Sequence, residues 1–176
     1  MKRIPIVIIA VLVFFAQSLA AQNIGSVQVS IKLHDKTMYY PADVPNNPVY
    51  VHVTVANKGQ NTLRFKLADD RVFSLDFNAF NVRNVKLAQT DSLIRKRTTS
   101  QTVYFRELAL EPEEEYAFIV DLKDFLTIKD PAIYYFELSF YPELYKSKSV
   151  SVVSNRLSIE INPNPGIAAG MSVPVD

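Results

Sequence analysis

Apolar and polar residues alternate with a period of two along most of this 176-residue chain. Residues 27–33 place valine, isoleucine or leucine at every second position, and residues 49–55 do the same with valine alone. Successive side chains of a β-strand point to opposite faces, so this alternation predicts half-buried strands with one wet face. Turn residues at 57–61 lead into a third alternating run at 63–67, which predicts a hairpin between the second and third strands.

Shorter alternating runs follow, each bounded by turn residues. They lie at residues 73–77, 103–105, 116–120, 134–140, 150–153 and 157–161. A count of about seven to nine short strands, with no long amphipathic helical window, favours two packed antiparallel sheets. The chain is therefore expected to be an all-β sandwich, with one helical turn at residues 122–126.

Three stretches interrupt the alternation. Residues 40–48 contain three prolines, which cannot donate ladder hydrogen bonds, so a loop is expected between the first two strands. Residues 81–101 mix scattered apolar residues with basic ones and predict one strand and an exposed basic turn. Residues 163–176 are rich in proline and glycine and predict a flexible tail.

The first residues have a different character from the rest. Lys2 and Arg3 precede an unbroken apolar run at residues 4–16, and small residues follow at Ala20 and Ala21. This is the pattern of a cleavable signal peptide at residues 1–21, since the run is too short for a membrane-spanning helix of about 20 apolar residues. The remaining chain predicts one domain at residues 22–162 followed by the tail. We expect a periplasmic or secreted protein.

The charge and the cysteine content limit the classes of partner and the kinds of site that this chain can have. The net charge is +1, and losing Lys2 and Arg3 gives 1 − 2 = −1, so no long-range field attracts nucleic acid or anionic membranes. The chain has no cysteine, which excludes disulfides, thiolate metal sites and a cysteine nucleophile. Together with the export signal and the absence of a glycosylation sequon, this favours a bacterial periplasm.

The segment at residues 130–136 carries the most specific local pattern. Asp130, Ala132 and Tyr134 have the spacing Asp-x-Gly/Ala-x-Tyr, and Phe136 follows two positions later. This segment resembles the tyrosine corner of immunoglobulin-like domains, in which Phe136 stands at the place of a half-cystine. The resemblance implies that the Tyr134 hydroxyl bonds back across the corner before the sixth strand.

Two other segments point to the same class of fold. Residues 51–77 resemble bacterial immunoglobulin-like modules of the intracellular proteinase inhibitor type. Residues 108–114 are similar to the Leu-x-Pro-Gly-Glu turn of such modules, with Glu113 in place of the usual glycine. The resemblance implies an immunoglobulin-like antiparallel β-sandwich, and it makes proteinase inhibition one alternative function.

Few residues are suited to catalysis or metal binding. His34, Asp35, Met38 and His52 are the only candidates for a metal site with nitrogen or thioether ligands, and His34 and His52 are expected to face the same side if their strands pair. A closed site needs three or four ligands, so we expect no metal and no cofactor. No Gly-x-Ser-x-Gly or helical Ser-x-x-Lys motif is present, and the acidic run at residues 111–115 is typical of a solvated turn. No catalytic residue is predicted.

Two groups of residues are candidates for partner binding. The first is the cationic cluster Arg95, Lys96 and Arg97, which is suited to an acidic surface unless it is only a solvated loop tip. The second group consists of tyrosines that either contact a partner or cap the ends of the sandwich: Tyr39, Tyr40, Tyr141 and Tyr145.

The leading functional hypothesis is a non-catalytic protein-interaction module of the periplasm or cell surface. Its partner is expected to be another envelope or secreted protein, contacted through loops or an exposed strand edge. The alternatives are a proteinase inhibitor or enzyme regulator, and a carbohydrate-binding module. The lack of tryptophan disfavours the last, because sugar-stacking platforms often use that residue.

Overall fold

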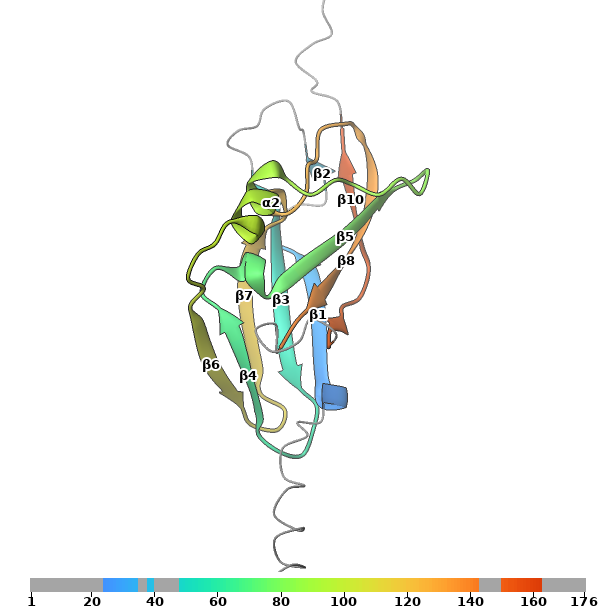
Figure 1. The fold of residues 1–176 in the computed structure, drawn as a ribbon. Helices are drawn as coiled ribbons and strands as arrows, with labels where there is room; N and C mark the ends of the chain where they lie inside the picture. The colour runs from blue at the N-terminus through green and yellow to red at the C-terminus, as the bar shows by residue number, and fades with distance from the viewer. Residues whose placement is uncertain (1–23, 35–37, 40–47, 143–149, 163–176) are drawn as a thin grey trace, which may run out of the picture.

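The computed structural model describes residues 24–34, 38–39, 48–142 and 150–162, so the expected signal peptide and tail lie outside it. About half of the described residues belong to short strands, which are the main regular elements, as predicted (Figure 1). In chain order the elements are η1 (Ile24–Ser26), β1 (Val27–Leu33), β2 (Met38–Tyr39), β3 (Tyr50–Asn57), β4 (Leu63–Ala68), η3 (Arg71–Phe73), β5 (Leu75–Asn81), α2 (Asp91–Thr98), β6 (Phe105–Leu110), β7 (Glu115–Asp121), η4 (Leu122–Asp124), β8 (Ala132–Phe140), β9 (Val152–Val153) and β10 (Leu157–Ile161).

The strands form three sheets. The first has the order β1-β3-β7 and stands upright through the middle of Figure 1. The second has the order β2-β10-β8-β5, with β9 paired to the end of β8. The third is the pair β4-β6. All strand pairs are antiparallel except β2 with β10, which is parallel. The expectation of antiparallel sheets is confirmed apart from that one short pair.

One hydrophobic cluster joins the three sheets. Val51, Val53 and Val55 of β3 are fully buried, while the residues between them are half-buried, as the alternation predicts. Phe65 of β4 meets Phe140 of β8 edge to face, with ring centroids 5.6 Å apart. Burying one such side chain stabilises a fold by about 1.5 to 3 kcal/mol, and the same cluster contains residues of β1, β5, β7 and β10.

The predicted hairpin between residues 49–55 and 63–67 is wrong. β3 already has β1 on one edge and β7 on the other, so β4 pairs with β6 instead. Asn57 is fully buried where the chain leaves β3. Its Nδ2 donates to the carbonyls of Asn61 at 2.8 Å and Leu110 at 2.9 Å, and its Oδ1 accepts from the N–H of Gly59 at 2.9 Å. This side chain fixes a turn that passes between sheets.

A side chain occupies part of the free edge of β1. The Ile31 N–H donates to Oδ1 of Asn155 at 2.8 Å, and Nδ2 of Asn155 donates to the Ile31 carbonyl at 3.0 Å. These are the two bonds that a neighbouring strand would give to Ile31. Because Asn155 lies between β9 and β10, it ties the first sheet to the second.

The hydrogen bond implied by the tyrosine-corner resemblance is present. Tyr134 is buried, and its hydroxyl donates to the carbonyl of Asp130 at 2.7 Å. Burial is the main cause that raises the pKa of Tyr134, and the Asp130 carboxylate adds to it. The bond therefore holds the start of β8 against the preceding loop.

The turn between β6 and β7 contains a residue with positive φ. Glu113 has φ 65°, in the left-handed region that favours glycine. Its N–H donates to the Asn57 carbonyl at 2.9 Å, and its carboxylate lies 2.7 Å from Nζ of Lys58. These contacts hold a residue other than glycine in that conformation.

Residues 81–101 differ most from expectation. In place of a strand and a basic turn, they contain a short turn, two isolated bridges and the helix α2. The strand expected at 103–105 begins only at Phe105, and the helical turn at 122–126 is confirmed as the short helix η4. Of the expected loop at 40–48, only Pro48 lies within the described residues. None of the helices in the described ranges is long and apolar enough to cross a membrane.

Candidate functional site

The basic residues 95–97 lie in the last turn of α2 rather than in a solvated loop. The helix begins where the Thr90 hydroxyl accepts the Leu93 N–H at 3.1 Å, and Asp91 stands in its first turn. Acidic residues at the start and basic residues at the end both stabilise the helix dipole. Leu93 is buried in the core, so α2 is packed against the fold and the expected basic turn is wrong.

The three cations of α2 do not form one contact surface. Nη1 of Arg97 lies 2.8 Å from Oδ1 of Asp76, and Nη2 donates to the carbonyls of Val72 and Leu75, both at 2.6 Å. Nζ of Lys96 lies 2.8 Å from Oδ2 of Asp70. Arg95 is exposed, and no carboxylate of the described residues lies within ion-pair distance of it. The cluster is therefore largely structural.

The candidate tyrosines are only partly described. The backbone of Tyr39 belongs to β2, but its side chain lies outside the described structure, as do Tyr40 and Tyr145. Tyr141 is half-buried next to β8, and its N–H donates to the Ser74 carbonyl at 2.9 Å. Burial is the main cause that raises the pKa of Tyr141, with a smaller effect of Asp76. Tyr141 thus lies near the Arg97–Asp76 pair with its side chain only partly exposed, and a role in partner binding stays a prediction.

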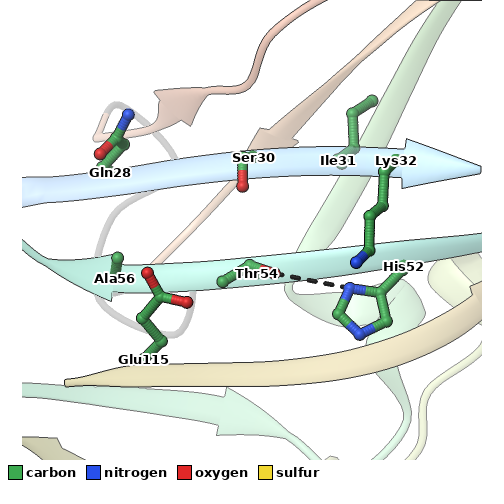
Figure 2. Close-up of a pocket in the computed structure, with 8 residues that line it drawn as sticks. All are labelled: Gln28, Ser30, Ile31, Lys32, His52, Thr54, Ala56 and Glu115. Atoms are coloured by element: carbon green, nitrogen blue, oxygen red, sulfur yellow. Dashed lines mark hydrogen bonds between the residues drawn. The ribbon is translucent and has the colours of Figure 1, made fainter.

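A more accessible polar site lies on the outer face of the β1-β3-β7 sheet. Antiparallel register places its side chains in three rows. The rows are Gln28–Ala56–Glu115, Ser30–Thr54–Ala117 and Lys32–His52–Ile119. The middle row has only small side chains, so the larger residues on either side form the walls of a shallow trough of about 340 Å³ (Figure 2).

The two ends of the trough differ in charge. At one end, the Lys32 side chain of β1 lies beside the His52 ring of β3 (Figure 2). At the other end are Gln28 and Glu115. His34 follows β1 on the same side, and its ring meets Tyr50 edge to face with centroids 6.2 Å apart. The prediction that His34 and His52 face the same side is confirmed by this pairing of β1 with β3.

The electrostatics of His52 follow from its neighbours. Burial is the largest cause that lowers the pKa of His52, and the charges of Lys32 and His34 lower it further. No described carboxylate lies within ion-pair distance of Lys32 or His52. The end of the trough at Lys32 and His52 therefore combines the Lys32 ammonium with the imidazole of His52, and no carboxylate among the described residues forms an ion pair with either.

The trough lacks a recognisable catalytic arrangement among the described residues. Oγ1 of Thr54 and Nδ1 of His52 are 3.5 Å apart, at the outer limit of a hydrogen bond. No described carboxylate bonds to His52 to orient it, as a nucleophile–base–acid set requires. Within the described ranges, no group of three or more His, Asp or Glu side chains is placed to hold a metal ion. Asp35 and the side chain of Met38 lie outside those ranges. The arrangement is suited to binding polar or anionic groups.

Sequence reasoning treated His34 and His52 as metal candidates or solvated histidines and did not include the trough. The signal was available in part, since Lys32 and His34 share the polar phase of one strand and His52 that of another. What the sequence lacked was the register that sets Lys32 opposite His52.

The comparisons with known proteins are of unequal weight. The sequence model of the family described as "Flagellar collar protein C, N-terminal domain" matches residues 28–162. None of the comparisons points to the intracellular proteinase inhibitor family, and no curated protein matches the chain.

The similar solved structures are distant. A β-glucosidase from Listeria innocua in complex with gluconolactone is 11% identical with a TM-score of 0.37, and the match covers 77% of this chain but 16% of the glucosidase. The periplasmic chaperone SfaE is 13% identical with a TM-score of 0.30, covering 83% of this chain and 59% of the chaperone. The yjhA protein from Bacillus subtilis is 9% identical with a TM-score of 0.31, covering 78% and 93% of the two chains. Such low TM-scores support no argument about fold or function.

Proposed function

The chain belongs to the family of the flagellar collar protein C N-terminal domain, and from that premise we propose that it is a non-catalytic envelope protein that binds another protein at the flagellum. The observation that carries the proposal is the extent of the family match, from residue 28 to residue 162. This range begins within β1 and ends just after β10, so it takes in nearly every described element.

We further propose that residues 22–162 form one immunoglobulin-like β-sandwich. The order β1-β3-β7 in one sheet and β10-β8-β5 in the other is compatible with that class. The Lys66 N–H donates to the Pro142 carbonyl at 3.3 Å, which places β4 beside the end of β8 and extends the second sheet toward β6. The Tyr134 bond to Asp130 supports the same assignment.

Export completes the proposal. Residues 1–21 have the charged start, apolar run and small residues of a cleavable signal peptide, so we place the mature protein in the periplasm or outside the cell. A rigid β-scaffold with an open polar sheet face is suited to recognising another protein. The alternatives of proteinase inhibition and sugar binding gain no support from the described residues.

The experiment is to locate the full chain in its own cells. A fluorescent tag that matures in oxidising compartments is fused to the C-terminus, and its position is compared with that of a flagellar marker. We expect foci that coincide with the flagellar marker and are lost in cells lacking flagella. A diffuse cytoplasmic signal, or foci unchanged in flagella-less cells, contradicts the proposal. N-terminal sequencing of the envelope fraction separately tests cleavage next to Ala20 or Ala21.

A further inference from the structure

We propose that the outer face of the β1-β3-β7 sheet binds an acidic segment of the protein partner, with one carboxylate seated between Lys32 and His52. This inference rests on the proposed function as an interaction module and names the chemistry of what that module recognises. The two can fail separately, because one concerns the place of the protein in the cell and the other a contact measured in solution.

The shape of the face allows a partner side chain to reach its backbone level. Ser30 and Thr54 lie directly opposite each other in the middle row of the trough. Next to them Ala56 offers only a methyl group, and it is nearly fully buried by its neighbours. Figure 2 shows Lys32 and His52 on one side of this row and Gln28 and Glu115 on the other. A side chain that enters the trough is therefore flanked by polar groups on three strands.

The donors at one end suit a carboxylate. The Lys32 ammonium supplies three N–H donors, the His52 ring at least one, and the hydroxyls of Ser30 and Thr54 line the adjacent floor. Hydrogen bonds from a charged donor to a carboxylate are about twice as strong as neutral ones. An acidic group placed here would therefore find direct charge-assisted contacts.

Charge complementarity is what selects this occupant. Six ion pairs occur among the described residues, and none of them involves Lys32, His34 or His52. The positive end of the trough is thus left without an internal counterion, unlike Lys96 and Arg97 of α2. An incoming carboxylate would supply the missing negative charge.

The far end of the trough limits where that charge can lie. Glu115 is four residues from Ile119 along β7, which is about 13 Å in an extended strand. A second acid of the partner would be repelled there, although Lys58 is near enough to be influenced by Glu115. The recognised segment must therefore place its acid at the Lys32 end and a neutral or basic residue near Glu115.

Binding should also depend on pH. The charged and titratable groups that act on His52 are Lys32 and His34 on the side of β1, whereas the acidic residues of β7, Glu115 and Asp121, lie in other rows of the sheet. The pKa of His52 lies below its usual value because of burial and the nearby charges of Lys32 and His34. A bound carboxylate favours the protonated ring, so affinity should rise as the pH falls from about 7.5 to 6.

The test uses the full chain and a fluorescein-labelled threonine-rich peptide with a single glutamate, so that the residue about 13 Å away beside Glu115 is neutral, and binding is followed by anisotropy. The control peptide has glutamine in place of that glutamate. We expect binding of the acidic peptide alone, weakening with added salt. Lys32→Gln and His52→Gln should each weaken it about 3- to 10-fold, as the loss of a charge-assisted contact predicts.

Two further variants make the outcome specific. Arg95→Gln removes an exposed positive charge of α2 outside the trough and should change the affinity less than about 1.5-fold. Glu115→Gln should strengthen binding up to about 2-fold by removing repulsion. Urea midpoints of all variants check that each still folds, and Lys32→Gln and His52→Gln provide independent readings of the same end of the trough.

Several results overturn the proposal. These are no binding of the acidic peptide, equal binding of the glutamine peptide, or equal losses in Lys32→Gln and Arg95→Gln. A fourth is binding to vesicles of anionic phospholipid that depends on Lys32 while the acidic peptide does not bind, which assigns the face to a membrane surface instead.

Discussion

Helix α2 and the outer face of the β1-β3-β7 sheet both carry basic residues, but the fold uses them in opposite ways. On α2, Arg97 and Lys96 are held by Asp76 and Asp70 of other elements, and only Arg95 is left exposed without an ion pair. On the sheet, Lys32 and His52 lie 20 positions apart in sequence yet opposite each other in register. Neighbours on a helix are turned by about 100° from one another, whereas cross-strand partners share a face. A dense run of charge in sequence therefore did not mark the accessible site.

The largest expected effect tests whether α2 is part of the folded core. Leu93→Ala should lower the free energy of unfolding by about 2 to 5 kcal/mol, because Leu93 is 1% exposed and its removal leaves a cavity. The matched control is Ile94→Ala at the next position, which is 45% exposed and should change stability by less than about 0.5 kcal/mol. Urea unfolding measures both. Equal effects would mean that α2 is only loosely attached.

The second prediction concerns the internal use of Arg97. Arg97→Ala should lower the free energy of unfolding by about 2 to 4 kcal/mol, since it removes the guanidinium donor to the Val72 and Leu75 carbonyls and the charged partner of Asp76, which keeps only its bond from Gln89. Arg97→Lys should recover only part of this loss. It keeps the positive charge next to Asp76, but an ammonium cannot make the same forked contact as a guanidinium. Arg95→Ala is the control and should change the urea midpoint little. It follows that replacing residues 95–97 together with serine would destabilise the fold.

The hydrogen bond from Tyr134 of β8 to Asp130 in the preceding loop provides a reference for these losses of stability. Tyr134→Phe should lower the free energy of unfolding by about 1 to 2 kcal/mol, because it removes the bond to the Asp130 carbonyl and keeps the ring. The far-ultraviolet circular dichroism should stay the same. If the urea midpoint does not move, the Tyr134–Asp130 hydrogen bond contributes nothing to stability, and it cannot serve as a reference for the loss measured in Arg97→Ala.

A smaller effect is expected on the open sheet face. Lys32→Gln should change the free energy of unfolding by less than about 0.5 kcal/mol, because the exposed ammonium has no ion pair in the described structure. The measurement is again the urea midpoint. A loss above about 1 kcal/mol would show that Lys32 serves the fold as Arg97 does, and the contrast between the two regions would disappear.

The smallest effect is a pH dependence that originates from His52. Its pKa in the folded protein is lowered from the usual value near 6.5, so the unfolded chain binds more protons as the pH falls below that value. The stability contribution of neutral His52 is thus full above pH 6.5 and decreases as the pH falls toward the folded pKa. Urea unfolding at several pH values, compared with His52→Gln, should show a slightly flatter profile for the variant. A steeper profile would have the wrong sign.

The alternation of apolar and polar residues was enough to predict most strands, because a strand that is buried on one face needs an apolar residue at every second position. Residues 27–33, 134–140 and 157–161 fall within or coincide with β1, β8 and β10. Sheet partners were harder, since nothing local in residues 57–63 says that both edges of β3 are already occupied. α2 was missed because its single buried residue, Leu93, gives no helical stripe, and its start depends on one capping hydroxyl.

The candidate site was less predictable than the fold. Arg95, Lys96 and Arg97 were chosen for their density, but their partners Asp70 and Asp76 are contributed by distant turns and strands. The trough depends on small residues at Ser30 and Thr54 being brought into one row, and only the strand register does that. Contact between elements, rather than composition, decides which charges remain available.

The carboxamide of Asn155 has a consequence for how two copies of this protein can meet. A free sheet edge invites pairing with the same edge of another molecule. The Asn155 side chain makes the two hydrogen bonds that a neighbouring peptide unit would make with Ile31, so an incoming strand would find no continuous row of bonding groups along β1. Two copies in contact would then be prevented from pairing edge to edge along β1, and any association between them would have to use other surfaces.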